Sequence, residues 1–168
     1  MPESILNGKH ILAVDDEPDV LNVLEEEIVE ICPECKFDKA NTYEEAVKKM
    51  TSIHYDLVIL DIMGVRGFEL LDLAVKHKFP VAMLTAHALT PDALKRSIAM
   101  LARVYLPKEK MGEIVPFLEY VLKYDYLSGW KRILEKFKAF FNARWGEGWQ
   151  KSEEKFWKEF DHKTAHIN

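Results

Sequence analysis

Five short strand-like segments alternate with helical patterns over the first 122 residues. Four of them are apolar runs, and a weaker one lies at residues 36–40; the runs read HILAV, LVIL, VAML and VYL. Strands that are apolar at every position are buried on both faces, as in a parallel sheet with helices on both sides. The pattern therefore predicts an α/β fold with a doubly wound, five-stranded parallel sheet.

Helices are predicted in the intervals between these segments. Two helix starts carry capping signals: Thr42 with Glu45 three residues later, and Thr90 directly before Pro91. The predicted helices begin near residues 18, 43, 68 and 91, and the last runs from about 110 to 123. This alternation of strand and helix is what a doubly wound sheet requires.

The last part of the chain differs in composition from the rest. The net charge of −5 divides into −8 for residues 1–122 and +3 for residues 123–168. The second segment also holds 11 of the 19 aromatic residues, including all four Trp. An acidic body is therefore followed by a mildly basic, aromatic-rich tail.

Aromatic and aliphatic residues in this tail recur at helical spacing. They predict one helix from about Ser128, a break at residues 146–148, and a second helix from about Ser152. The chain is thus predicted to consist of an α/β unit at residues 1–123 and an α-helical hairpin at residues 124–168.

Composition excludes several classes of protein. No uncharged apolar run approaches the roughly 20 residues that cross a bilayer, and the acids that follow the first apolar run exclude a secretory signal. Cys32 and Cys35 form a CxxC that follows a helix, unlike the thioredoxin motif, and no second pair completes a zinc site. We expect a structural, unbonded pair of thiols in a cytoplasmic protein.

Charged and hydroxyl side chains stand at the ends of four predicted strands. Asp15 and Asp16 follow the first, Asp61 the third, Thr85 the fourth and Lys108 the fifth. Ligands of such sheets bind beyond the carboxyl ends of the strands. Each acid could instead be a turn residue or a helix cap, as Asp16 could be for the first helix. The occurrence of these residues at four strand ends favours a site.

The chemistry of such a site follows from its charges. Three carboxylates close together raise each other's pKa, and a divalent cation removes the repulsion. Hard oxygen ligands suit Mg²⁺. A carboxylate can also attack phosphorus to form an aspartyl phosphate. Asp61 stands alone at the expected central strand and is the predicted acceptor.

The chain resembles the response-regulator receiver domains of two-component signalling over about residues 7–122. Five segments carry the resemblance: ILAVDDEPDV, DLVILDIM, GFELL, VAMLTAHA and YLPK. The resemblance implies a flavodoxin-like sheet with strand order 2-1-3-4-5. It also implies a phosphoacceptor switch rather than an enzyme with substrate turnover, active only in its own phosphorylation and dephosphorylation.

The resemblance implies a Mg²⁺ ion held at the carboxyl edge. Its ligands would be Asp15, Asp16, Asp61 and the backbone carbonyl of Met63. Met63 and His87 would also tune the rate of phosphoryl hydrolysis. The alternative for His87 is a loop residue exposed to solvent without a role in the site.

The resemblance likewise assigns the phosphoryl chemistry. Asp61 would accept the phosphoryl group from a histidine kinase or a phosphotransfer protein. Thr85 would hydrogen-bond that group and Lys108 would pair with it. Tyr105 would change rotamer on activation.

Two departures from the family pattern affect these expectations. The loop from Met63 to Gly67 is shorter than usual and lacks the family's Pro and acid-Gly pair. Glu109 follows Lys108, where the family usually has Pro after a cis bond. A cis bond that does not precede Pro costs about 2.5–4 kcal/mol, so we expect a trans bond here.

We expect a response regulator that signals through protein contacts with an effector. The alternative is a receiver-fold scaffold that dimerises through its C-terminal helices, with phosphorylation incidental. The tail is short and only mildly basic for a DNA-binding domain, so we expect neither a nucleic acid nor a membrane as partner. Its helices could pack on their own chain, form a homodimer or dock a partner.

Overall fold

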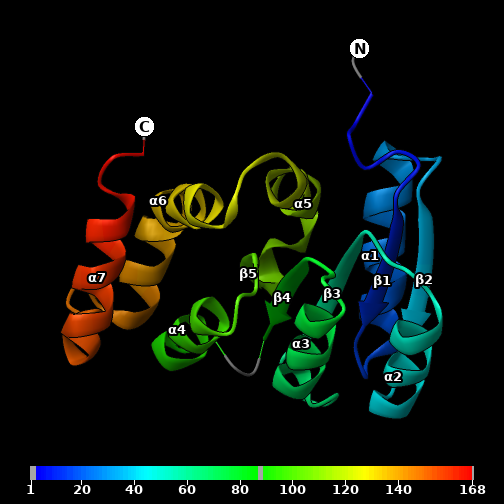
Figure 1. The fold of residues 1–168 in the computed structure, drawn as a ribbon, viewed down its shortest axis with the longest axis horizontal. Coiled ribbons are helices and arrows are strands. Elements are labelled where there is room, and N and C mark those ends of the chain that lie inside the picture. The colour runs from blue at the N-terminus through cyan, green and yellow to red at the C-terminus, as the bar shows by residue number, and fades with distance from the viewer. Residues whose placement is uncertain (1–2, 87–88, 168) are drawn as a thin grey trace.

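A five-stranded parallel sheet forms the centre of the computed structural model, which describes residues 3–86 and 89–167 (Figure 1). The strands are β1 (His10–Val14), β2 (Lys36–Ala40), β3 (Leu57–Asp61), β4 (Val81–Thr85) and β5 (Val104–Pro107). Their order is β2-β1-β3-β4-β5, and every neighbouring pair is parallel. The predicted doubly wound sheet and its strand order are confirmed.

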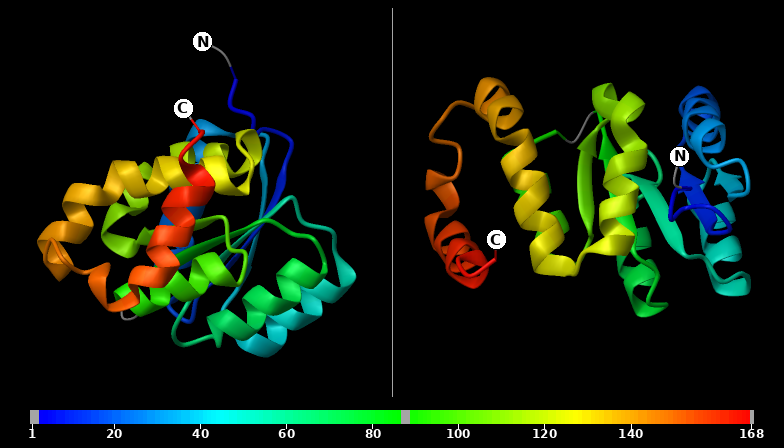
Figure 2. Two further views of the ribbon diagram at one scale, coloured as in Figure 1. Left: turned by 60° about the vertical axis from the view of Figure 1, so that its left-hand side comes forward. Right: turned by 90° about the horizontal axis from the view of Figure 1, so that it is seen from above.

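Helices cover both faces of this sheet (Figures 1 and 2). They are α1 (Pro18–Ile31), α2 (Tyr43–Ser52), α3 (Gly67–Lys76), α4 (Pro91–Ala99) and α5 (Ile114–Lys123). Helices α1 and α5 pack against each other, as do α2 and α3. Two predicted caps are confirmed. Thr42 Oγ1 accepts a hydrogen bond from the N–H of Glu45, and Thr90 Oγ1 accepts one from the N–H of Ala93, both at 3.1 Å.

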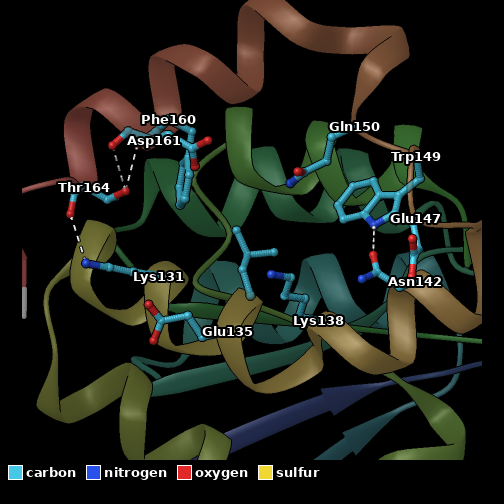
Figure 3. A pocket seen from close by; sticks show the side chains of 11 residues that line it. Lys131, Glu135, Lys138, Asn142, Glu147, Trp149, Gln150, Phe160, Asp161 and Thr164 are labelled. Carbon is cyan, nitrogen blue, oxygen red and sulfur yellow. Dashed lines mark hydrogen bonds between the residues drawn. The ribbon is translucent and has the colours of Figure 1, made fainter.

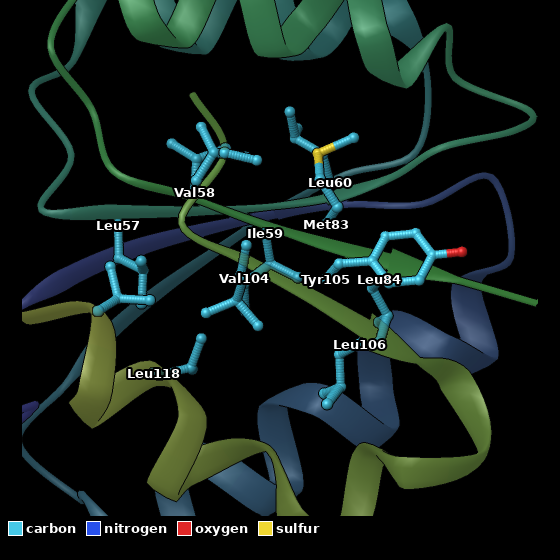
Figure 4. Close-up of a cluster of buried hydrophobic side chains, with 14 of the residues drawn as sticks. Leu57, Val58, Ile59, Leu60, Met83, Leu84, Val104, Tyr105, Leu106 and Leu118 are labelled. Atoms are coloured by element: carbon cyan, nitrogen blue, oxygen red, sulfur yellow. The ribbon is translucent and has the colours of Figure 1, made fainter. Parts of the chain in front are cut away.

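Strand β3 lies at the centre of the hydrophobic core. All its residues are buried, and Figure 4 shows side chains of β3, β4 and β5 filling the space between the sheet and its helices. Successive side chains of a strand point to opposite faces, so a central strand needs apolar residues at every position. The continuous apolar runs in the sequence reflect this burial.

The last helix of the α/β unit begins later than predicted. A 3₁₀ helix, η1 (Lys108–Glu113), precedes α5, which starts at Ile114 rather than near residue 110. Pro116 explains the difference. It fits the first turn of a helix, but in a helix from residue 110 its ring would clash with the carbonyl of Gly112.

The tail forms the predicted α-helical hairpin. Its helices are α6 (Tyr126–Trp145) and α7 (Glu154–Thr164), joined through a 3₁₀ turn, η2 (Lys151–Glu153). Helix α6 starts before Ser128 because the Asp125 carboxylate accepts the N–H of Ser128 at 2.8 Å and caps the helix. The second helix begins at Glu154 rather than at Ser152, which lies inside η2. Gly146 ends α6 as predicted, with a φ of 85°.

Helix α6 packs on its own chain, over the edge of the sheet formed by β5, and lies between α5 and α7 (Figure 2). The indole N–H of Trp130, which is fully buried, donates to the carbonyl of Ala102 at 2.8 Å. Phe137 stacks on Phe117 of α5, with 4.9 Å between ring centroids. The aromatic side of α6 is therefore an internal surface that extends the core and covers an edge strand.

The cysteine pair is structural, as expected. Cys32 and Cys35 are buried and form no disulfide. The thiol of Cys35 contacts the carbonyl of Lys9 at 3.3 Å. Burial, followed by the influence of Cys32, raises the pKa of Cys35 to about 11. The thiol is thus protonated at neutral pH and a poor nucleophile.

None of the described helices combines the length and the apolar composition that a membrane crossing requires.

The contact between Trp130 and Ala102 should contribute measurably to stability. We expect Trp130→Phe to lower the free energy of unfolding by roughly 1–3 kcal/mol, because it leaves a buried carbonyl without a partner. Denaturant unfolding measures the difference. Trp149→Phe is the matched control, since that indole N–H donates to the half-buried side chain of Asn142 at 3.1 Å. An equal or smaller loss for Trp130→Phe would contradict the packing described here.

Candidate functional site

The sheet register brings the predicted residues to one edge. Val14 pairs with Leu60, so Asp15 lies next to Asp61 on the adjacent strand. Thr85 pairs with Pro107, and Lys108 follows directly. All four predicted strand ends therefore meet at the carboxyl edge of the sheet.

Three carboxylates converge there. Oxygen atoms of Asp15, Asp16 and Asp61 all lie within 4.8 Å of one another. Asp15 and Asp61 are almost fully buried, with 1% and 4% of their surface exposed, whereas Asp16 faces solvent. A set of hard oxygen donors open to water on one side fits Mg²⁺, which retains several waters when bound.

Lys108 supplies the opposite charge. Its ammonium lies 2.8 Å from Asp15 Oδ2 and 3.5 Å from Asp61 Oδ1. The side chain of Lys108 is 9% exposed. Neither Asp15 Oδ2 nor Lys108 Nζ makes a well-directed hydrogen bond despite burial. The two atoms instead face each other as a buried ion pair.

Burial controls the ionisation of these groups. It raises the pKa of Asp61 to about 7, with the charge of Asp15 adding to the effect and Lys108 opposing it. Burial also raises the pKa of Asp15, although Lys108 acts against the change. Burial acts to lower the pKa of Lys108, but the two carboxylates hold it above its ordinary value. A bound cation would favour the ionised carboxylates.

Two glycines shape the loop after Asp61. Gly64 has a φ of 82°, and a Cβ there would lie 2.6 Å from the carboxylate of Asp16. A Cβ at Gly67 would lie 2.1 Å from the backbone oxygen of Asp61. The loop can therefore close over the carboxylates only because both positions lack a side chain. The short loop is evident in the sequence, whereas the closeness of Gly64 to the carboxylate of Asp16 is not.

Asp16 does not cap α1, so that alternative is wrong. Residue Glu17 holds the N-cap position, and its N–H donates to Asp15 Oδ1 at 2.9 Å. This bond holds one oxygen of the Asp15 carboxylate, and the other oxygen lies 2.8 Å from Lys108 Nζ. Glu17 was not predicted as a site residue; its Oε1 lies 3.8 Å from Lys108 Nζ.

The other predicted residues take the following positions. Thr85 is fully buried at the end of β4. Tyr105 is fully buried on β5, and its hydroxyl accepts the N–H of Thr90 at 3.2 Å. Met63 lies in the loop with half of its surface exposed. His87 lies outside the described residues. The peptide bond between Lys108 and Glu109 is trans, as expected.

A hollow of about 250 Å³ lies between α6 and α7 (Figure 3). Trp149 lies along one side of the hollow, and both lysines and acidic residues line the rest of it. Lys131 is directed to the C-terminal end of α7, where it donates to the Thr164 carbonyl at 3.3 Å. None of the predicted site residues lines this hollow. Its mixed charge defines no class of ligand.

The raised pKa of Asp61 has a consequence for stability. Between pH 4 and 7 the folded state binds more protons at Asp61 than the unfolded state, so this residue makes stability fall as pH rises. In the absence of metal at pH 8, we expect Asp61→Asn to raise the free energy of unfolding by roughly 2–4 kcal/mol. The gain should disappear below about pH 4, where the carboxyl is protonated in both states.

Denaturant unfolding at pH 3.5 and pH 8 measures this gain. Asp72→Asn is the control, because Asp72 is an exposed carboxylate that pairs with Lys76, at 2.9 Å, on the surface of α3. Its effect should stay within about 0.5 kcal/mol at both pH values. A loss of stability in Asp61→Asn at pH 8 would contradict the assigned repulsion.

Comparison with known proteins identifies the family. The family model described as response regulator receiver domain matches residues 11–118. The two-component response regulator ARR18 of Arabidopsis thaliana is 35% identical over 107 residues, which are 60% of this chain and 16% of that protein. The chain thus aligns with only a small part of this curated relative.

Solved structures share the fold. Response regulator protein TrrA of Thermotoga maritima, in complex with Mg(2+)-BeF, is 36% identical and has a TM-score of 0.58, with 67% of this chain and 98% of that chain covered. The receiver domain protein of Methanospirillum hungatei has a TM-score of 0.57 at 23% identity, with 68% and 97% covered. The sheet order, the convergent acids and these matches lead to one conclusion: the chain belongs to the response regulator receiver domain family of two-component signalling.

Proposed function

We propose that this protein is a phosphoacceptor switch in which Asp61 receives a phosphoryl group. One observation carries the proposal. Asp61 is a buried carboxylate within 4.8 Å of two further carboxylates and 3.5 Å from the ammonium of Lys108. Phosphoryl transfer depends mainly on positioning and on neutralising charge, and these neighbours are suited to both.

The proposed reaction uses groups of this chain. An oxygen of ionised Asp61 attacks phosphorus of a phosphohistidine, the phosphorus–nitrogen bond breaks, and the histidine nitrogen leaves with the bonding electrons. The product is an acyl phosphate on Asp61. Lys108 neutralises charge on the transferred group, and the hydroxyl of Thr85 donates a hydrogen bond to it. Hydrolysis of the acyl phosphate by water returns the switch to its starting state.

Asp15, Asp16, Asp61 and the backbone carbonyl of Met63 are the residues proposed to hold Mg²⁺. When bound, the ion supplies positive charge to the phosphoryl oxygens. The open side at Asp16 allows water to complete the coordination shell. The Mg(2+)-BeF complex of TrrA supports this proposal, since TrrA is 36% identical to this chain. Met63 and His87 are proposed to tune hydrolysis, and Tyr105 to change rotamer on activation.

A histidine kinase or a phosphotransfer protein is the proposed donor of the phosphoryl group. The signal is proposed to pass by contact with an effector protein.

DNA binding is less well supported by the tail, because its aromatic residues are turned toward its own chain and its net charge is only +3. Dimerisation through the same aromatic face would require that face to leave the core. We also propose that the protein acts in the cytoplasm.

Phosphoryl uptake by Asp61 can be tested directly. With Mg²⁺ present, acetyl phosphate should label the wild type because it carries a transferable phosphoryl group. Beryllofluoride should bind to the wild type because its fluorine atoms take the places of phosphoryl oxygens. Asp61→Asn should lose both activities by at least about 100-fold, since the nucleophile is removed. Intact-mass measurement at neutral pH detects the acyl phosphate, and Asp72→Asn should behave as the wild type. A wild type that takes up neither compound would falsify the proposal.

Gly64 offers a second test of the metal site. We expect Gly64→Ala to weaken Mg²⁺ binding by roughly 10-fold or more, because its Cβ displaces the carboxylate of Asp16. Titration calorimetry with Mg²⁺ measures the affinity. Gly8→Ala is the matched control, since Gly8 has a similar φ of 79° but an added Cβ meets nothing within 4 Å. Equal affinity for the two variants would remove Gly64 from the site.

A further inference from the structure

The C-terminal end of α6 contacts both chain segments that leave the carboxyl edge beside it. One segment runs from Thr85 at the end of β4 toward α4, and the other begins at Lys108 after β5. Figure 1 shows α6 beside α4 and β5, on the far side from β2. The end of this helix is therefore placed where movements of either segment would reach it.

The first contact joins α6 to the segment after β4. The indole N–H of Trp145, in the last turn of α6, donates to the carbonyl of Leu89 at 3.1 Å. Leu89 stands four residues after Thr85 and directly before Thr90, the cap of α4. A displacement of Leu89 relative to α6 would lengthen this bond.

The second contact joins α6 to the segment after β5. The guanidinium of Arg144 lies 2.5 Å from Glu109 Oε1. Glu109 is adjacent to Lys108, whose ammonium now pairs with Asp15 at 2.8 Å. The ion pair is partly exposed and contributes little stability by itself. It nevertheless ties the end of α6 to the residue next to the charged group of the site.

Tyr105 provides a third connection between the site edge and α6. Its ring lies 6.3 Å from that of Phe141, and its hydroxyl contacts the backbone of Thr90. Phe141 in turn stacks on Trp145, with 4.6 Å between ring centroids and 1° between ring planes. All three contacts thus converge on the last two turns of α6.

The beginning of the helix is held differently. Trp130 is bonded to Ala102 in the buried interior, and the hydroxyl of Tyr126 donates to the carbonyl of Ile98 in α4. The turn η2 before α7 has a separate contact, since the ammonium of Lys95 in α4 lies 2.8 Å from the carboxylate of Glu153. These contacts involve no predicted site residue. The two ends of α6 are therefore anchored to different parts of the α/β unit.

We propose that the last two turns of α6 are a conformational sensor of Asp61, held by the Trp145–Leu89 and Arg144–Glu109 contacts and loosened when the site is loaded. The proposal rests on the phosphoacceptor function proposed above. A phosphoryl group adds about 1.5–2 negative charges and strong hydrogen-bond acceptors. It would attract Thr85 and Lys108, the residues at which both tied segments begin.

Hydrogen exchange of the full-length protein tests the sensor. Adding beryllofluoride with Mg²⁺ should accelerate exchange of amides in residues 137–145 by about fivefold, the effect of losing one hydrogen bond. Amides around Trp130 should be unchanged, because that end of α6 is anchored away from the site. Bound beryllofluoride is quantified on the same samples by its fluorine resonance.

Trp145→Phe is the informative variant. It keeps the ring but removes the bond to Leu89, so exchange in residues 137–145 should be fast without ligand and should change little on loading. By reciprocity, the variant should bind beryllofluoride more tightly, by about the same factor. Trp149→Phe is the matched control, since Trp149 contacts the same aromatic cluster but its indole N–H donates to Asn142 within α6 and not to the segment after β4. It should respond to loading as the wild type does.

The outcomes separate the two proposals. Absence of bound beryllofluoride would overturn the phosphoacceptor function and the sensor together. Bound beryllofluoride with unchanged or slower exchange in residues 137–145 would overturn the sensor alone. Equal behaviour of Trp145→Phe and Trp149→Phe would also overturn it, because the bond to Leu89 would then have no part in the coupling.

Discussion

The structure depends on one electrostatic constraint, the burial of two carboxylates side by side at the carboxyl edge of the sheet. Asp15 and Asp61 lie in a water-poor environment where like charges repel strongly, and Lys108 offsets only part of this repulsion. The apolar strands beneath them provide the stability that makes the arrangement possible. In the free protein the site is consequently a region of electrostatic repulsion, which a bound cation would relieve.

The position of the site was predictable because parallel strands place their carboxyl ends at one edge. Four strand-end residue types were therefore enough to locate Asp61 and Lys108. Their mutual distances were not predictable, since they depend on sheet register and twist. The contact of Gly64 with Asp16 was also missed, because it joins residues 48 positions apart across a loop that no periodicity describes.

The tail shows a different limit of sequence reasoning. Helical spacing indicated which side of α6 is buried, but an apolar stripe does not specify what it packs against. Its counterpart is distributed over Phe117, Tyr105 and the carbonyl of Ala102, which come from separate elements. The later start of α5 had a local cause that was visible in the sequence, since Pro116 restricts where that helix can begin.

The distribution of tryptophan has an optical consequence. All four Trp lie beyond residue 123, at positions 130, 145, 149 and 157, and none lies in the part of the chain that carries the site. Three of them form a chain of ring contacts from Trp145 through Trp149 to Trp157. Intrinsic fluorescence excited at the red edge of protein absorption therefore reports on the helical extension alone. A ligand at the carboxyl edge would bind in a part of the chain without tryptophan. A change in tryptophan fluorescence on its binding would therefore report a change in the helical extension.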